Sequence, residues 1–335
     1  MTFDNIKLDK SFYSTDMNGF TNTLEELDPS TEYKGTALEG LDAFERQLKR
    51  FDIKVKGYNC DTVEKFFSNS QTAVLFPEFV KRCVKSGINE TDVLKDITAT
   101  STKIIGTDYR PITCVNEGDD GKANTVAEGA AIPVTKVKTQ GKLITLNKRG
   151  RILAATYESL RFKRLDLISV MLKQIGKNIV TAQLGDAINV IISGDGNSNP
   201  AKEISVASKP NLTYNDLIKL WSQFSDYQMN CLLAAPDVMQ KLLAIEELKN
   251  PMTGLNFQAT GKLTTPLGAT LYQSASVPAG KLVAIDKTCA IEEVVCDEIN
   301  VDYDKLIDKQ LEEAAITSTK GFAKLFKDAA VVMAV

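Results

Sequence analysis

The chain has 335 residues, of which 43% are apolar and 25% charged, so it can bury a sizeable core and form two domains with extensions. Its formal net charge of −3 argues against a protein that coats nucleic-acid phosphates. The absence of histidine excludes Ser-His-Asp and Cys-His catalysis and H-E-x-x-H zinc sites, and it argues against an enzyme without excluding one that works through Asp, Glu or Lys.

The apolar runs of the sequence are all shorter than the ~18 residues that a membrane span needs, and the N-terminal MTFDNIKLDK lacks the features of a signal peptide. We therefore expect synthesis in a cytoplasm and no membrane association. The six cysteines lie far apart without a C-x-x-C pair, so we expect reduced, mostly buried thiols in preference to a zinc site or a disulfide framework. These residues are Cys60, Cys83, Cys114, Cys231, Cys289 and Cys296.

The first part of the chain is predicted to contain an arm followed by helices. Residues 1–35 are polar and irregular, which is typical of a loosely ordered terminus. Apolar residues recur at helical spacing from 36 to 51, which predicts a short amphipathic helix that either covers the protein's own core or binds a partner. The segment 62–87 is apolar on one face, and a helix is expected to begin at Pro77 and to end at Gly87.

Residues 116–150 are predicted to form an extended loop. The tip is rich in glycine and acidic residues, and from Gly141 aliphatic residues alternate with charges, as in half-exposed strands. Such a segment is poorly able to bury itself on its own subunit, so we expect it to lie on a neighbouring copy. Its basic residues lack the aromatic groups of a nucleic-acid site, and we expect them to pair with acidic groups of the neighbour. The candidate contact residues are Lys122, Lys136, Lys138, Lys142, Arg149 and Arg151.

A long amphipathic helix is predicted from Asp166, a suitable N-cap, to Ile192. At ~1.5 Å per residue it would be roughly 40 Å long. Gly176 and Gly185 weaken it locally and permit close packing. A short helix capped by Thr156 is expected before it. The apolar stripe of the long helix consists of Ile168, Leu172, Ile175, Ile179 and Ala182.

Strands and helices alternate in the remainder of the chain, which makes α+β the expected fold class. Further helices are expected at 214–227 and 236–248. Strands are expected at 231–235, 269–272, 281–285 and the C-terminal 329–335, and the first and last of these are expected to be buried.

Several patterns that could carry chemistry are rejected. The stretch 254–262 ends in Gly-Lys, but Asn256 and Leu263 stand where a phosphate loop needs glycine and a hydroxyl residue. The stretch that begins at Asp195 opens like a calcium loop, but it lacks the required glycine and the bidentate glutamate, so we interpret it as a polar turn. Two adjacent carboxylate pairs are interpreted as surface charges: Glu292 with Glu293, and Glu312 with Glu313.

Three segments in this order resemble a known family: KRGRILAATYESL, a long helix that ends in ISGDGNSNP, and CLLAAPDVMQKLLA. The chain resembles the major capsid proteins of tailed double-stranded DNA bacteriophages, whose fold is named after phage Hong Kong 97. The resemblance covers about 72–335, and its closing segment LGATLYQSASVPAGKLVAIDKTCAIEEVV fits as well.

The resemblance implies a division of the chain into the parts of that fold. It places an N-terminal arm and short helix at 1–71, the start of the peripheral domain at 72–115 and the extended loop at 116–150. The peripheral domain with its spine helix would follow at 151–199, the axial domain at 200–290, and the C-terminal strands that return to the peripheral domain at 291–335.

The resemblance also implies a function. The chain would be a structural subunit with no enzymatic activity and no cofactor or metal, forming hexamers and pentamers of an icosahedral shell around double-stranded DNA. It would belong to the virion and assemble in the bacterial host cytoplasm. Its partners would be itself, portal, scaffolding and decoration proteins, and packaged DNA in non-specific contact.

Two departures from the type member of this family matter. That member carries a long helical scaffolding segment that a protease removes, whereas the first 70 residues here are short and irregular, so we expect a separate scaffolding protein. It also crosslinks a loop lysine to an asparagine near the C-terminus, and here no asparagine follows Asn300, so we expect no such crosslink.

Two alternatives stay open at this point. An encapsulin, a cellular nanocompartment shell on the same fold, would hold cargo enzymes in place of a genome, and the neighbouring genes would distinguish the two. An enzyme that works through Asp, Glu or Lys would be a monomer or small oligomer with a deep polar pocket, which size-exclusion chromatography would reveal.

Overall fold

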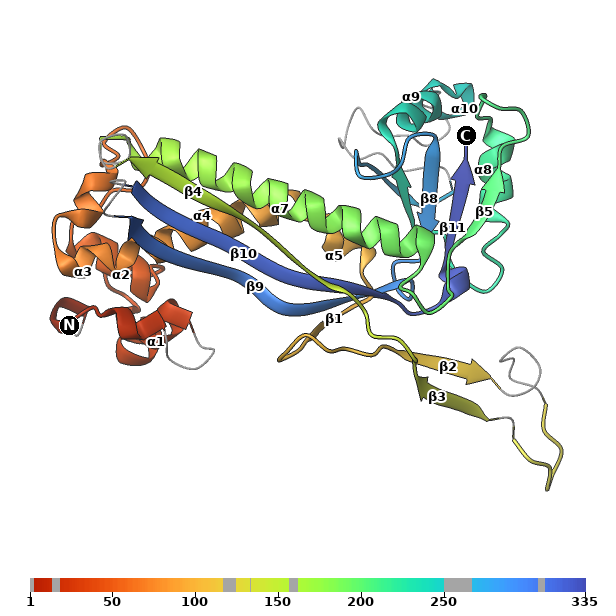
Figure 1. Ribbon diagram of the computed structural model, residues 1–335, viewed down its shortest axis with the longest axis horizontal. Helices are drawn as coiled ribbons and strands as arrows, with labels where there is room; N and C mark the ends of the chain where they lie inside the picture. Colours follow the sequence, from red (N-terminus) through yellow and green to blue (C-terminus); the bar gives the residue numbers. More distant parts are fainter. Residues whose placement is uncertain are drawn as a thin grey trace. The chain divides into compact units, whose positions relative to one another are not determined.

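The computed structural model describes residues 3–13, 19–116, 125–132, 134–156, 162–249, 267–306 and 311–335 (Figure 1). It divides into two compact units, each built from separate stretches of the chain. The first unit comprises Met1–Thr91, Arg149–Ile179 and Ile299–Ser318; the second comprises Asp92–Lys148, Val180–Glu298 and Thr319–Val335.

The first unit is built around helices. Its α-helices are α1 (Gly19–Leu27), α2 (Ala43–Arg50), α3 (Ser70–Ala73), α4 (Leu75–Thr91) and the first half of α7 (Leu165–Ser193). Short 3-10 helices join them at Phe3–Asn5, Lys10–Tyr13, Ser30–Tyr33 and Val63–Phe67. The predicted stripe of α7 enters the core of this unit, where Ile168, Leu172 and Ile179 are buried.

Helices α4 and α7 lie side by side at a very close crossing (Figure 1). A β-carbon added to Gly87 of α4 would overlap the backbone of Lys173, and one added to Gly176 of α7 would overlap the carbonyl oxygen of Val84. The expected close packing at Gly176 is confirmed. The expected end of the helix at Gly87 is wrong: α4 continues to Thr91, because this glycine is needed for the crossing and not for a cap.

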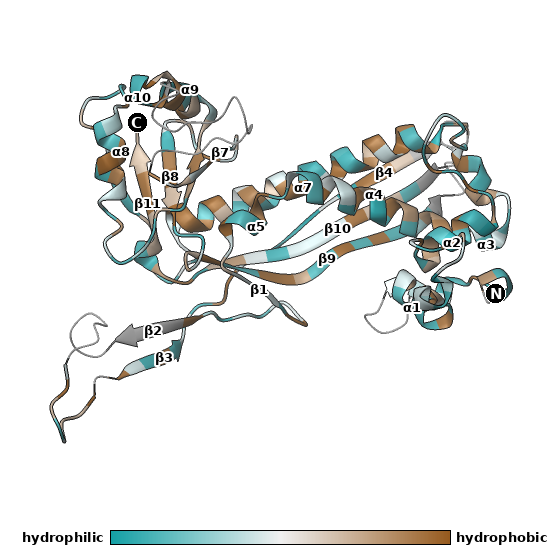
Figure 2. Ribbon diagram, turned by 180° about the vertical axis from the view of Figure 1, so that it is seen from behind, coloured by the Kyte–Doolittle hydropathy of each residue, from teal (hydrophilic) through white to brown (hydrophobic). Residues whose placement is uncertain are grey.

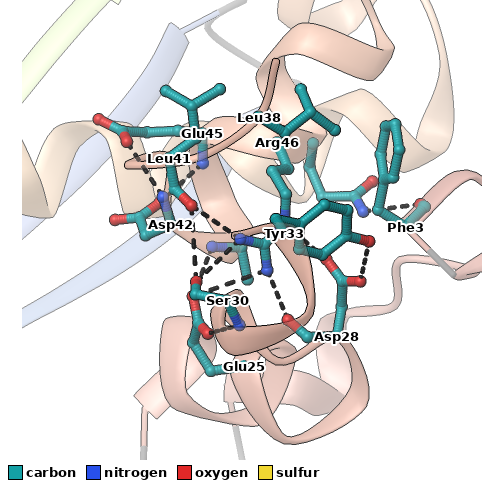
Figure 3. Close-up of polar contacts among 12 residues, drawn as sticks. Phe3, Glu25, Asp28, Ser30, Tyr33, Leu38, Leu41, Asp42, Glu45 and Arg46 are labelled. Carbon is teal, nitrogen blue, oxygen red and sulfur yellow. Dashed lines mark hydrogen bonds and ion pairs between the residues drawn. The ribbon is translucent and has the colours of Figure 1, made fainter. Parts of the chain in front are cut away.

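The N-terminal residues are more ordered than the sequence predicts. Helix α1 buries Phe20 and Leu24 in the core of the first unit. The segment between α1 and α2 is held by the buried guanidinium of Arg46 in α2. Its Nε donates to Asp28 at 2.7 Å, and its Nη1 donates to the Leu41 carbonyl at 2.7 Å (Figure 3). Tyr33 donates to the second oxygen of Asp28 at 2.5 Å. A polar network of this kind produces no apolar periodicity in the sequence. Residues 1–35 are therefore predicted as a loosely ordered terminus although the network orders part of them.

A four-stranded sheet has the order β1 (Thr100–Lys103), β9 (Ile291–Leu306), β10 (Leu311–Lys324) and β4 (Leu146–Thr156). Strand β1 runs parallel to β9, with Thr100 opposite Glu292. The C-terminal strands expected after residue 290 are therefore two long strands, followed by β11 (Ala330–Ala334).

The second unit contains a five-stranded mixed sheet and short helices. Its strand order is β5 (Lys202–Ser205), β11, β8 (Lys281–Ile285), β6 (Cys231–Ala234) and β7 (Thr270–Gln273). Strands β6, β8 and β11 are almost wholly buried, as their apolar runs predict, and Figure 2 shows β8 and β11 as hydrophobic. The helices are α5 (Leu94–Ile97), α8 (Tyr214–Trp221), α9 (Pro236–Ala244) and α10 (Glu246–Lys249).

Several predicted elements differ from those observed. The helix expected through residue 227 ends at Trp221, whose side chain is half exposed, although Phe224 beyond it is buried. The helix expected from 236 to 248 is interrupted at Ile245, which has an extended backbone. The short helix expected after Thr156 lies largely outside the described residues.

Within the described residues, every helix is too short or too polar to cross a membrane. The five cysteines whose side chains the structure describes are free thiols, with Cys231 buried and the other four partly buried.

Candidate intersubunit surface

Two strands of the second unit form a ribbon of their own, β2 (Ile112–Asn116) with β3 (Thr135–Thr139). They run antiparallel and side by side, with Ile112 opposite Thr139 (Figure 1). Every residue of β3 is exposed. A two-stranded hairpin is at best marginally stable in water without a surface to cover it. We call β2 and β3 the ribbon.

The ribbon has two chemically different faces, because side chains alternate along a strand and directly paired residues share a face. Lys136 and Lys138 lie on one face of β3, which we call the basic face. Thr135, Val137 and Thr139 lie on the other, together with Ile112, the partner of Thr139. Ile112 and Val137 are 53% and 63% exposed, so this second face is apolar and open to solvent.

The base of the ribbon is anchored in the second unit. Backbone pairing continues below it, from Gln140 N–H to the Pro111 carbonyl at 2.8 Å and from Ile144 N–H to the Tyr109 carbonyl at 3.1 Å. Ile144 is buried in a small cluster with Val294 and Ala323. These contacts fix where the ribbon begins.

A buried carboxylate supports the same base. Glu292 accepts hydrogen bonds from Thr102 Oγ1 at 2.5 Å and from Tyr109 Oη at 2.8 Å. Burial and the Glu292 carboxylate together raise the pKa of Tyr109. Glu293 pairs with Lys320 at 2.6 Å. The interpretation of Glu292 and Glu293 as surface charges is therefore wrong, because strand pairing brings distant hydroxyl and ammonium groups to them.

The structure places the candidate contact residues in three places. Lys136 and Lys138 lie together on the basic face, and the exposed Lys142 follows, its backbone N–H donating to Asn197 Oδ1 at 3.0 Å. Arg149, partly buried, and Arg151, exposed, lie on β4 within the first unit. Lys122 lies outside the described residues. The apolar face is not among the sequence-based predictions, although the alternation Thr-x-Val-x-Thr from residue 135 indicates it.

The rejected motifs remain without support. In the described residues, no group of three or more Cys, Asp or Glu side chains could hold a metal ion. The stretch 254–262 lies outside those residues. At the polar turn after α7, Asp195 Oδ1 accepts from Asn197 N–H at 3.1 Å and Oδ2 accepts from Lys324 N–H at 3.1 Å, so the carboxylate stabilises the turn itself.

Comparison with solved structures establishes the fold. The virus-like particle from Pyrococcus furiosus is 17% identical, with a TM-score of 0.50 over 76% of this chain and 98% of that chain. The capsid of Cyanophage P-SCSP1u is 13% identical, with a TM-score of 0.52 over 73% and 88%. The protein of Microbacterium phage Oxtober96 is 12% identical, with a TM-score of 0.51 over 70% and 89%. The fold is thus the α+β fold of particle-forming shell proteins, as the sequence predicts.

The sequence itself identifies the family. The family model described as "Phage capsid protein" matches residues 139–316, more than half of the chain, and the chain therefore belongs to that family. No curated protein matches the sequence at a significant level. The chain is a structural subunit of a phage capsid, a component of the virion that associates with copies of itself.

Proposed function

We propose that copies of this chain form hexamers and pentamers, which close into an icosahedral shell around double-stranded DNA, and that residues 116–150 form an extended loop that lies on a neighbouring copy. The exposed ribbon is the observation that carries this proposal. Contacts around a ring are heterologous, so the ribbon of each copy and the surface that receives it are two different patches repeated around the axis.

The energetics of the ribbon support a covering partner. Val137 and Ile112 expose most of their side chains on one face, and fully burying such side chains stabilises by about 1.5–3 kcal/mol each. Because the basic face is exposed as well, the ribbon can contact a neighbour with either side. The candidate contact residues Lys122, Lys136, Lys138, Lys142, Arg149 and Arg151 would contribute charge pairs, each worth only about 0–1 kcal/mol when exposed.

Deletion of residues 118–140 tests the role of the loop. We expect a folded subunit, as measured by circular dichroism, that elutes as a monomer or small oligomer and forms no particles by electron microscopy. A variant in which a Gly-Ser segment of equal length replaces 118–140 controls for the shortened connection and should fail in the same way. Particles at normal yield from either variant would contradict the proposal.

The remaining parts of the chain take their proposed roles from the same fold. Residues 72–115 and 151–199 would form the peripheral domain with α7 as its spine helix, residues 200–290 the axial domain, and 291–335 the returning strands. Portal, scaffolding and decoration proteins would be further partners, and assembly would occur in the host cytoplasm. The subunit is proposed to catalyse no reaction. Membership of a capsid family and the lack of histidine support this proposal.

Contact with packaged DNA is proposed to be sequence-blind and weak for each subunit. The chain carries a net charge of −3, and its basic face is assigned to protein contacts. Empty particles should bind duplex DNA poorly at physiological salt, with a shallow dependence on salt because few phosphates are neutralised. Tight binding that weakens steeply with salt in a filter-binding assay would overturn this proposal.

A further inference from the structure

We propose that the basic face of the ribbon on one copy docks on an acidic row of a second copy, formed by Asn300, Asp302 and Asp304 on β9. The inference rests on the proposed role of the ribbon as an intersubunit contact and names the surface that receives it. Lys136 and Lys138 would face the carboxylates of Asp302 and Asp304.

The acidic row is held on a firm base. Residues alternate along β9, so Ile299, Val301 and Tyr303 pack against the core of the first unit while Asn300, Asp302 and Asp304 are exposed. The ring of Tyr303 lies 5.7 Å from that of Phe76, edge to face. A strand with one face embedded in this way presents its other face as a fixed row.

The first member of the row positions the second. Asn300 Nδ2 lies 3.2 and 3.3 Å from the two carboxylate oxygens of Asp302 and donates toward them. This contact restrains the carboxylate and leaves its charge in place, since an amide donor is neutral. Asp302 is exposed and therefore accessible to a cation from outside the subunit.

The edge of β9 beside the row favours docking by side chains. Strand β1 pairs with β9 only from Glu292 to Val295, so in the described part of the chain no strand lies on that side of residues 299–304. Charged residues on such an open edge oppose the addition of a further strand through its backbone. A ribbon carrying the opposite charge can instead approach the exposed face of the row.

The charges on the two surfaces match in spacing. Residues two apart on a strand are separated by roughly 6.5–7 Å, at about 3.3–3.4 Å per residue. Lys136 and Lys138 on the ribbon, and Asp302 and Asp304 on the row, share this separation, so both pairs can form at once when the strands lie face to face. Complementary charges of this kind set register and partner choice more than affinity.

Charge exchange tests the pairing. The variant K136E/K138E should lose at least about tenfold in particle yield at physiological salt, and D302K/D304K should lose as much, because each places like charges in contact. The variant that combines all four substitutions should regain most of the yield. Mixing the two double variants should restore six-membered rings, since the two variants can alternate around the ring so that the acidic ribbon of one meets the basic row of the other, whereas a five-membered ring keeps one like-charged contact. Yield is measured by size-exclusion chromatography and electron microscopy, with folding checked by circular dichroism.

The control is K34E/K56E, which changes the charge by the same amount at two exposed lysines of the first unit and should assemble normally. Normal assembly of either double variant, or no recovery in the fourfold variant, would overturn the pairing. Recovery in the fourfold variant without six-membered rings in the mixture would also overturn it, because the contact would then lie within one copy. If D302K/D304K does not fold, D302N/D304N should show weaker salt dependence of assembly than the native chain, and unchanged salt dependence would count against the pairing.

Failure of this inference is distinct from failure of the proposed function. If deletion of 118–140 prevents assembly while the charge variants assemble normally, the ribbon is an intersubunit contact that docks elsewhere. If the deletion variant assembles normally, the proposed role of the ribbon fails as well.

Discussion

Gly176 of α7 packs directly against the carbonyl oxygen of Val84 in α4, and a β-carbon at residue 176 would also approach the Ile88 nitrogen to 3.2 Å. Gly87 makes the reciprocal approach from α4 to Lys173. The crossing is therefore closed by two glycines, one from each helix. A glycine inside a helix costs roughly 0.5–1 kcal/mol relative to alanine, so its use here implies a larger gain from the close contact.

We expect Gly176→Ala to destabilise the unassembled subunit by about 1–3 kcal/mol, because the added methyl group forces the two backbones apart. Gly185→Ala in the same helix is the matched control. Its β-carbon would lie 3.7 Å from Ser276, an ordinary contact, so this change should be neutral or stabilise by up to about 1 kcal/mol. Urea unfolding measures both. Equal effects of the two substitutions would show that the crossing does not require a glycine at 176.

Arg46 is expected to be essential for the N-terminal part of the first unit. Its guanidinium lies 2.7 Å from Asp28, and both side chains are almost fully buried. Arg46→Met removes the cation and leaves the Asp28 carboxylate buried without it, which should cost roughly 3–5 kcal/mol. Adding Asp28→Asn should recover part of that loss. Lys49→Ala, an exposed position of the same helix, should change the free energy of unfolding by less than about 0.5 kcal/mol.

The elements that the sequence predicts are those with a strong local pattern. The stripe that includes Ile168, Leu172 and Ile179 locates α7 to within a residue at each end, and the apolar runs locate β6, β8 and β11. These elements can be predicted because each packs against one core, which gives a regular spacing or an unbroken run of apolar residues in the sequence. The resemblance then supplies the fold, which local patterns alone do not specify.

The features that the sequence does not predict depend on contacts between distant residues. Arg46 meets Asp28 across a turn that has no apolar period, and Glu292 meets Thr102 only because β1 and β9 pair. In the candidate site, charge alone indicated the lysines of the ribbon. Its apolar face and the acidic row became visible only once strand pairing showed which residues share a face.

Two thiols, one buried and one partly buried, should be unreactive in the folded subunit. Burial raises the pKa of Cys231 to about 12 and that of Cys83 to about 11. Because the thiolate is the reactive form, both should label with maleimide at about pH 8 far more slowly than in the urea-unfolded chain. Mass spectrometry of labelled peptides after a short pulse measures this. Labelling of Cys231 at the unfolded rate would contradict its burial.

Lys324 should make stability depend on pH in the alkaline range. Its ammonium is buried in the second unit, where Nζ donates to the Ile191 carbonyl at 3.1 Å, and burial lowers its pKa to about 8. In the unfolded chain a lysine titrates near about 10.4. Between these values the unfolded state holds a proton that the folded state has released, so the free energy of unfolding should rise with pH, by at most about 1.4 kcal/mol per pH unit. Below about pH 8 both states hold the proton, and the slope from this group should vanish.

The substitution Lys324→Met isolates this contribution, because it keeps the length of the side chain and removes the titration. Urea unfolding of the native chain and of the variant across about pH 7 to 10.5 gives the difference in stability, in which the other titrating groups cancel. At about pH 7 the folded native chain carries a buried charge, so the methionine variant should have the higher free energy of unfolding. This advantage should shrink as the pH rises past 8. The lost hydrogen bond to Ile191 shifts the whole difference but not its slope. A difference that stays constant across the range would show that Lys324 does not titrate below its usual pKa in the folded subunit.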